Sequence, residues 1–185
     1  MRNRLTCIIP FYNETDSILE ILSELSNIKN ITQFICVDDG SANKLSEKIQ
    51  KRFSKALLIK LDKNYGKSIA VKIGLEKVNE EDIILFDADL KNVKKYEVEK
   101  AIEIYFSKNF NLLIMKNLGD NKFIDGIFRK DILQSGKRII SKQDLNNIFS
   151  NELNGFELEV AINKYMIDNN KKIGWVENSA YNLHK

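Results

Sequence analysis

Residues 82–90 read Asp-Ile-Ile-Leu-Phe-Asp-Ala-Asp-Leu, a short apolar run that ends in two carboxylates one residue apart. The consecutive apolar residues from Ile83 to Phe86 are typical of a strand that is covered on both faces in a parallel sheet. Asp87 and Asp89 follow where that strand ends, and open α/β sheets bind ligands outside the carboxyl ends of their strands. Two carboxylates this close repel each other without a cation, so the stretch predicts a divalent metal that bridges phosphate oxygens. An Asp-x-Asp pair alone is also common in ordinary turns.

Strands and helices alternate through the first half of the chain. The apolar patterns predict strands at 5–10, 34–37, 56–61 and 83–86, and helices at 15–25, 45–53 and 68–78. Strands separated by helices of about ten residues form βαβ units. The expected fold class is therefore α/β, with a mainly parallel, doubly wound sheet and helices on both of its faces. Because the sequence contains no linker and no internal repeat, we expect one domain over residues 1–185.

The second half of the chain is less regular. Its patterns predict helices at 96–106, 142–149 and 155–167, strands at 112–115 and 124–128, and a closing pair of strands at 173–176 and 179–183. Residues 116–122 are polar and predict a loop.

The composition favours a globular chain without a nucleic-acid partner. The 29 basic and 26 acidic side chains leave a formal charge of +3, which is mild for 185 residues. With 43% hydrophobic residues and one proline, disorder is not expected. Cys7 and Cys36 lie in strand-like apolar runs without a Cys/His cluster around them. We therefore expect a reducing, cytoplasmic location, with neither a disulfide framework nor a zinc site.

The sequence indicates at most a peripheral contact with a membrane. The first predicted strand begins at Leu5, which leaves no room for a signal peptide before it. No apolar run approaches the roughly 18 residues that a membrane span needs. Any membrane role, for example at the inner face of a membrane, is expected to be peripheral.

Each strand of the first half is followed by a polar loop. The four loops contain residues 10–14, 38–41, 64–67 and 87–89. Parallel strands bring these loops to one sheet edge, where they predict a single concave site. Asp38 or Asp39 offers an acceptor for the imide N–H of a base, Pro10 and Tyr12 offer flat surfaces, and Lys67 offers a charge for phosphates. The alternative for each loop is ordinary turn and helix-cap chemistry.

Two other phosphate-handling motifs fit less well. Gly66-Lys-Ser68 invites comparison with a P-loop, but that motif needs glycine where this chain has Leu61. A receiver-type phosphorylation domain also has paired acids after an early strand. It leaves Asp89 and the region after residue 125 unexplained.

Together the four loops resemble the nucleotide-sugar half of family 2 glycosyltransferases, which have the GT-A fold. The resemblance is carried by Ile8-Ile-Pro-Phe-Tyr-Asn-Glu14, Val37-Asp-Asp-Gly-Ser41, Asn64-x-Gly-Lys67 and Phe86-Asp-Ala-Asp-Leu90. It implies an inverting transferase that takes a sugar from a UDP- or GDP-sugar donor with Mg²⁺ or Mn²⁺. It also implies that residues 1–92 form the nucleotide-sugar half and residues 93–185 the acceptor half.

The resemblance assigns roles to individual residues of the first half. The implied nucleotide-sugar-binding residues are Pro10, Tyr12, Glu14, Asp38, Asp39, Gly66, Lys67, Asp87 and Ala88. Asp89 would ligate the metal and take part in catalysis, while Asp87 would face the ribose or a metal-bound water. Lys91 stands where dolichol-phosphate-mannose synthases carry glutamine, which weakens the match to that subgroup.

The second half resembles glucosyl-phosphoglycerate synthases and some polyprenyl-phosphate sugar transferases. The matching segments are Ser135-Gly-Lys-Arg138 and Gly155-Phe-Glu-Leu-Glu159. They imply that Gly136 and Arg138 bind an acceptor, which would be a sugar, a phosphorylated small molecule or a lipid phosphate. The arginine fork suits an anionic acceptor. Glu159 would be the catalytic base; Glu157 lies about 200° further round the expected helix, so at most one of the two should face the pocket.

His184, the one histidine of the chain, matches a histidine that completes the metal site in the phosphoglycerate-type enzymes. Imidazole suits Mn²⁺ better than Mg²⁺. The alternative is a solvent-exposed terminal side chain.

Two rival functions stay open at this point, as does a homodimer. A sugar-phosphate nucleotidylyltransferase should carry a glycine-rich loop after the first strand, and residues 10–14 contain no glycine. A catalytically silent nucleotide-binding module would keep nucleotide affinity without metal-dependent turnover.

Overall fold

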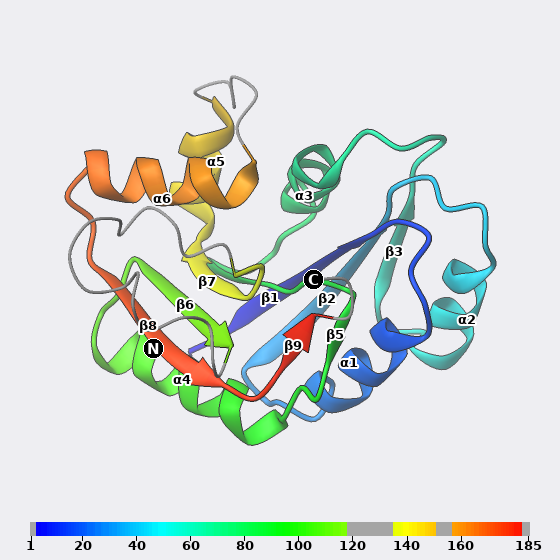
Figure 1. Ribbon diagram of the computed structural model, residues 1–185, viewed down its shortest axis with the longest axis horizontal. Helices are drawn as coiled ribbons and strands as arrows, with labels where there is room; N and C mark the ends of the chain where they lie inside the picture. The colour runs from blue at the N-terminus through cyan, green and yellow to red at the C-terminus, as the bar shows by residue number, and fades with distance from the viewer. Residues whose placement is uncertain (1–2, 118–134, 151–156, 183–185) are drawn as a thin grey trace.

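The structure is a computed structural model that describes residues 3–117, 135–150 and 157–182 (Figure 1). The strand predicted at 124–128, His184 and the start of the helix predicted at 155–167 lie outside these ranges.

The described residues form nine strands and six helices. The strands are β1 Leu5–Phe11, β2 Ile31–Asp38, β3 Leu57–Lys60, β4 Asp82–Leu85, β5 Leu90–Lys91, β6 Leu112–Asn117, β7 Arg138–Ser141, β8 Ile173–Asn178 and β9 Tyr181–Asn182. The helices are α1 Ser17–Leu25, α2 Leu45–Arg52, α3 Lys67–Leu75, α4 Lys95–Ser107, α5 Lys142–Ser150 and α6 Leu158–Asp168.

A seven-stranded sheet in the order β3-β2-β1-β4-β7-β6-β8 forms the centre of the molecule. β1 to β4 pair in parallel, as do β6 and β8, whereas β7 is antiparallel to both β4 and β6. This arrangement confirms the predicted α/β class with a mainly parallel sheet. β5 and β9 pair separately as a small antiparallel sheet, and both strands are labelled in Figure 1.

Helices cover both faces of the main sheet, as predicted. Successive strand residues point to opposite faces, so Cys7 and Ile9 pack with α1, α2 and α4 while Ile8 packs with α3, α5 and α6. The strands are therefore buried on both faces, which is the physical reason for their unbroken apolar runs.

In the second half one strand was missed and two predictions were wrong. β7 was not predicted, because Ile139 and Ile140 make too short a run to stand out without their partners on β4 and β6. Lys116 and Asn117 belong to β6 and are buried, so the predicted loop does not begin at residue 116. The two closing strands do not pair with each other, since β8 joins β6 and β9 joins β5.

Candidate functional site

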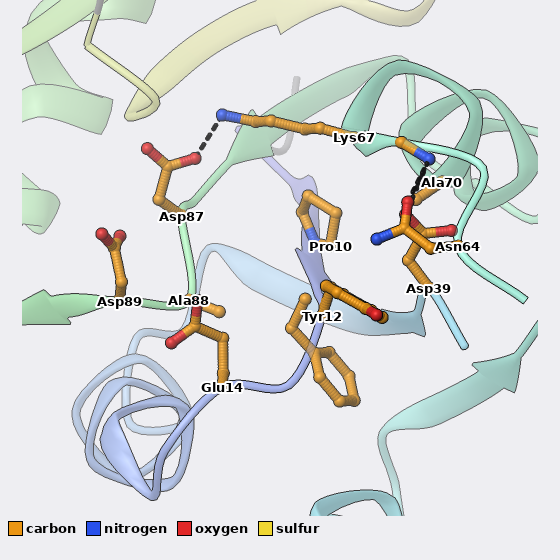
Figure 2. A pocket seen from close by; sticks show the side chains of 12 residues that line it. Pro10, Tyr12, Glu14, Asp39, Asn64, Lys67, Ala70, Asp87, Ala88 and Asp89 are labelled. Atoms are coloured by element: carbon orange, nitrogen blue, oxygen red, sulfur yellow. Dashed lines mark hydrogen bonds and ion pairs between the residues drawn. The ribbon is translucent and has the colours of Figure 1, made fainter. Parts of the chain in front are cut away.

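A pocket of about 280 Å³ opens at the carboxyl edge of β1, β2 and β4, and all four predicted loops reach it (Figure 2). Its lining consists of Pro10, Phe11, Tyr12, Glu14, Asp39, Asn64, Gly66, Lys67, Ala70, Asp87, Ala88 and Asp89. Figure 2 shows Asp87 and Asp89 on one side of the pocket and Asp39 with Asn64 on the other. The topology has therefore brought together the residues that the parallel sheet predicted as neighbours.

The Asp87–Asp89 turn is held from three directions. Ser17 Oγ on α1 donates a buried hydrogen bond of 2.7 Å to the carbonyl oxygen of Ala88. Asn182 Nδ2 on β9 donates to Asp89 Oδ1 at 2.8 Å. Gly136 packs so closely on Asp87 that a β-carbon at position 136 would lie 1.8 Å from Asp87 Oδ2. The positions of both carboxylates are thus fixed by segments that lie far from them in the sequence.

Lys67 at the start of α3 links the two halves of the chain. Its ammonium group forms ion pairs with Asp87 and with Glu159 on α6, the latter at 2.5 Å. Burial lowers the pKa of Lys67, but the neighbouring carboxylates of Asp87 and Glu159 outweigh it, so the pKa is raised overall. Lys67 therefore remains a cation at neutral pH, placed between the predicted metal-site carboxylate and the predicted base.

The structure separates the two candidate acids of the second loop. Asp38 is fully buried, accepts a hydrogen bond of 2.7 Å from the Ser41 backbone N–H and a second from the Ser46 hydroxyl, and does not line the pocket. These contacts give it the turn-stabilising role that was the alternative for this loop. Its predicted contact with a nucleotide is not supported by this position.

Asp39 lines the pocket and also holds the third loop in place. Its two carboxylate oxygens accept hydrogen bonds of 2.8 Å from the backbone N–H groups of Tyr65 and Gly66. The loops approach so closely that a β-carbon at Gly40, whose φ is +78°, would lie 2.3 Å from the carbonyl carbon of Lys63. Glycine at position 40 therefore allows Asp39 to reach the neighbouring loop.

A second pocket of about 470 Å³ adjoins the first and shares Gly66, Lys67 and Asp87 with it. Its other lining residues are Tyr65, Ser68, Glu157, Leu158 and Glu159. Both glutamates line it, which corrects the expectation that at most one would. Glu157 precedes α6 and has an extended backbone with ψ of 146°, so the rotation of a helix does not separate the two side chains.

Arg138 lies at the start of β7 and is only 1% exposed. Its Nε donates to the Ser135 carbonyl at 2.7 Å, and Nη1 donates to Asn163 Oδ1 at 2.6 Å. Burial lowers the pKa of Arg138 to about 10, although Glu159 and Asp87 oppose the shift. Arg138 is not among the described residues that line the two pockets, so its role toward an acceptor stays a prediction.

Sequence reasoning missed the residues that support the acidic turn. Ser17 and Asn182 carry no motif of their own. The available signal for Asn182 was its place two residues before His184, which lies outside the described ranges. The structure places Gly136 against Asp87, and its predicted contact with an acceptor stays a prediction.

The chemistry of the acidic turn fits a hard divalent cation. Asp87 and Asp89 offer carboxylate oxygens, which Mg²⁺ and Mn²⁺ prefer, at the rim of one pocket. Within residues 3–117, 135–150 and 157–182, no group of three or more His, Cys, Asp and Glu side chains could hold a metal. A complete coordination sphere would therefore need a further protein ligand or oxygens from a bound substrate.

No helix in the described part of the chain is long and apolar enough to cross a membrane.

Residues 6–158 match the family described as glycosyl transferase family 2. Over 150 residues the chain is 30% identical to an undecaprenyl-phosphate 4-deoxy-4-formamido-L-arabinose transferase from Klebsiella pneumoniae, which covers 75% of this chain and 43% of that protein. A transferase of the same description from Photorhabdus laumondii is 36% identical over 97 residues, or 48% of this chain and 30% of that protein. The chain thus spans less than half the length of these relatives.

Solved structures share the fold at low sequence identity. Glucosyl-3-phosphoglycerate synthase from Mycobacterium tuberculosis, in complex with Mn²⁺, UDP-glucose and phosphoglyceric acid, aligns with a TM-score of 0.77 and 15% identity over 98% of this chain and 72% of that one. TarS from S. aureus aligns with a TM-score of 0.71 and 18% identity over 96% of this chain and 59% of that one. At these identities the likeness establishes the fold alone.

Proposed function

The chain belongs to glycosyl transferase family 2, and from this premise we propose that it is an inverting, metal-dependent enzyme that moves a sugar from a UDP- or GDP-sugar to an acceptor hydroxyl or phosphate. The family assignment removes the nucleotidylyltransferase alternative. The observation that carries the finer proposal is the convergence of Asp87, Asp89 and Lys67 on one pocket that opens into a second. A donor in the first pocket would present its sugar to an acceptor in the second.

The acidic turn is proposed to hold Mg²⁺ or Mn²⁺ against the donor diphosphate. Asp89 and Asp87 would supply carboxylate oxygens, and we propose His184 as a further ligand, since Asn182 brings the chain to Asp89 two residues before it. When bound, the cation supplies Lewis-acid stabilisation of negative charge on the departing diphosphate. The synthase of similar fold was solved with Mn²⁺ and UDP-glucose, which supports this choice of ions and donor.

The first pocket is proposed to bind the nucleotide. Tyr12 is 46% exposed at its rim and offers an aromatic face to a base, with Pro10 beside it. Asp39 and Glu14 offer carboxylate acceptors for the base or ribose. Lys67, already a cation between Asp87 and Glu159, would offer its charge to the phosphates.

Glu159 is proposed as the base that takes the proton when the attacking group of the acceptor is a hydroxyl; a phosphate acceptor is already ionised at neutral pH and needs no base. Glu159 lines the second pocket. Its ion pair with Lys67, which also pairs with Asp87, directs its carboxylate toward the part of the pocket that Asp87 lines. An inverting displacement needs such a base on the acceptor side of the sugar, away from the leaving diphosphate. Glu157 lines the same pocket and is the alternative base.

The acceptor class is proposed from the relatives. Their names specify undecaprenyl phosphate in the curated transferases, and phosphoglyceric acid is bound in the synthase of similar fold. We therefore propose a phosphorylated small molecule or a lipid phosphate as the acceptor, in preference to an uncharged sugar. Gly136 and Arg138 are proposed to shape that side of the site, Arg138 from its buried position beneath α6.

The buried thiols are consistent with a proposed cytoplasmic location. Cys7 and Cys36 are both free and fully buried. Burial raises the pKa of Cys36 to about 12, so this thiol is unreactive at neutral pH.

A panel of UDP- and GDP-sugars with and without Mn²⁺ tests the proposal. We expect one sugar nucleotide to raise the melting temperature in the presence of Mn²⁺ and to be slowly hydrolysed, and Asp89→Ala to abolish both effects. Asp168→Ala, which removes an exposed carboxylate paired with Lys164 on α6, is the control and should behave as wild type.

Two results would count against the proposal. A metal-independent melting shift without turnover would favour the silent nucleotide-binding module. If no sugar nucleotide raises the melting temperature, the proposal fails.

A further inference from the structure

A lysine side chain is buried near the end of β4, beside a small cavity that Phe86, Asn178 and Ala180 also line. Lys137 is 2% exposed and ranks among the largest fully buried side chains of the molecule. Its ammonium donates to Asn178 Oδ1 at 2.9 Å, to the Ala180 carbonyl oxygen at 3.2 Å, and to Asn117 Oδ1 at the end of β6.

Burying an ammonium group costs free energy unless its donors are satisfied. An ammonium has three N–H donors, and Lys137 directs one to the end of β6, at Asn117, and two to the β8–β9 turn, at Asn178 and Ala180. An apolar side chain of the same size would fill the space but would bind none of these oxygens. The chemical property that lysine adds here is therefore a fixed connection between the segments.

Two of the segments that meet at Lys137, its own segment before β7 and the β8–β9 turn, lead to the two carboxylates. Gly136, the preceding residue, packs against the Asp87 carboxylate. Asn182, two residues beyond Ala180, donates to Asp89. The buried Lys137 ammonium thus joins the segment of Gly136, which packs on Asp87, to the turn that leads to Asn182, which bonds to Asp89.

The turn between β8 and β9 is anchored at two places. Ser179 bonds to Glu97 and to Asn92, and Asn178 bonds to Lys137 and to the end of β6. Asn178 Oδ1 accepts from both the Lys137 ammonium and the Ala180 backbone N–H, and Asn178 Nδ2 donates to the Lys116 carbonyl at 3.0 Å. The asparagine is therefore held in one orientation, with its Oδ1 facing the Lys137 ammonium. From this turn the chain enters β9, which pairs with β5 directly after Asp89.

We propose that Lys137 is a positioning residue that sets the spacing of Asp87 and Asp89 through Gly136 and Asn182. The inference rests on the proposed function, since its consequence is affinity for the divalent cation. Loss of the ammonium frees the Asn178–Ala180 side of the β8–β9 turn, while Ser179 still holds the other side through Glu97 and Asn92, so the position of Asn182 against Asp89 becomes less well defined. Lys137 itself contacts neither the cation nor the substrate.

The test compares Lys137→Met with Lys142→Met. Lys142 also donates to a backbone carbonyl, that of Val78 at 2.7 Å, but lies at the start of α5. Mn²⁺ affinity is measured by electron paramagnetic resonance of the free ion, and hydrogen exchange is followed over residues 178–182. We expect Lys137→Met to weaken Mn²⁺ binding by about tenfold or more, with faster exchange over 178–182, while kcat recovers at saturating Mn²⁺. Lys142→Met should match wild type in all three.

Each failure has a distinct meaning. Wild-type Mn²⁺ affinity in Lys137→Met overturns the positioning role alone, even if the melting temperature falls. A wild-type protein that binds no Mn²⁺ in the presence of UDP overturns the proposed function and the role of Lys137 with it.

If Lys137→Met folds poorly, Asn178→Ala takes its place as a milder change in the same network. Whichever variant folds is then combined with Asn182→Ala in a double-mutant cycle. If both residues act through β9, the two losses of Mn²⁺ affinity are less than additive in free energy. Full additivity would overturn the route through Asn182.

Discussion

The α-carbon of Gly136 faces the carboxylate of Asp87 so closely that a β-carbon at position 136 would lie 1.8 Å from Oδ2 and 2.0 Å from Cγ. The acidic turn and the segment before β7 are therefore complementary surfaces. Any side chain at residue 136 must displace Asp87 or shift the start of β7.

Gly136→Ala should reduce metal-dependent turnover by about 100-fold or more, because a displacement of about 1 Å in a catalytic constellation has effects of this size. Steady-state rates over a range of Mn²⁺ concentrations measure it. Gly174→Ala is the matched control, since its β-carbon would lie 2.5 Å from the Phe110 ring, outside the site. It should lower the melting temperature but leave the Mn²⁺ dependence intact. Equal effects of both variants on Mn²⁺ dependence would show that Asp87 is not specifically displaced.

The ion pairs of Lys67 should stabilise the protein at the same level throughout the neutral range. The folded-state pKa of Lys67 is raised, so its contribution is complete below the unfolded value of about 10.4 and is lost as pH rises through the folded value. The melting-temperature difference between wild type and Lys67→Met should therefore be constant from about pH 6 to pH 9 and shrink above about pH 10.5. Thermal melts in a pH series measure it, with the exposed Lys48–Asp16 pair as a control through Lys48→Met. A difference that disappears by pH 8 would contradict the raised pKa.

Asp38→Asn and Asp39→Asn should separate stability from nucleotide binding. Asp38 is buried and bonded to Ser41 and Ser46, so its substitution should lower stability by about 1–3 kcal/mol while UDP still raises the melting temperature. Asp39 lines the pocket and holds the Tyr65–Gly66 backbone, so its substitution should also remove the UDP-induced shift. Chemical denaturation and thermal shift with UDP measure the two effects. Loss of the UDP shift in Asp38→Asn alone would reverse the assignment.

Glu159→Gln should lower kcat by about 10²–10⁴-fold, the range expected when a general base is removed. Glu157→Gln, a change of the same kind in the same pocket, should leave kcat near the wild-type value. Release of nucleoside diphosphate at saturating donor measures both rates. If Glu157→Gln lowers kcat more than Glu159→Gln does, Glu157 is the base.

Arg138→Met should raise the KM for an anionic acceptor about tenfold while donor KM is unchanged, since an interaction with one charged group contributes on this order. Asn163→Ala removes the partner of Arg138 Nη1 but keeps the guanidinium, so it should lower the melting temperature without changing either KM. Initial rates with varied donor and acceptor distinguish the cases. Equal increases for both substrates would mean that Arg138 supports the fold rather than the acceptor.

The first half of the molecule was predictable because its signals are local. Apolar runs and helical periodicity lie within single segments, and parallel pairing then places every loop that follows a strand at one edge of the sheet. Asp87, Asp89 and Lys67 could thus be grouped before any coordinates were known, and the structure places them at one pocket.

The sequence by itself determined the α/β class, the succession of the first four strands along the chain and the residue types at the pocket rim, since each follows from short-range pattern and chain connectivity. Tertiary structure alone decided which acid of the Asp38–Asp39 pair faces the pocket, that β7 runs antiparallel between β4 and β6, and that Gly136, Lys137 and Asn182 support the acidic turn. These relationships join segments that are distant along the chain. They depend on how side chains fill space and satisfy hydrogen bonds after the sheet has formed, which no local pattern encodes.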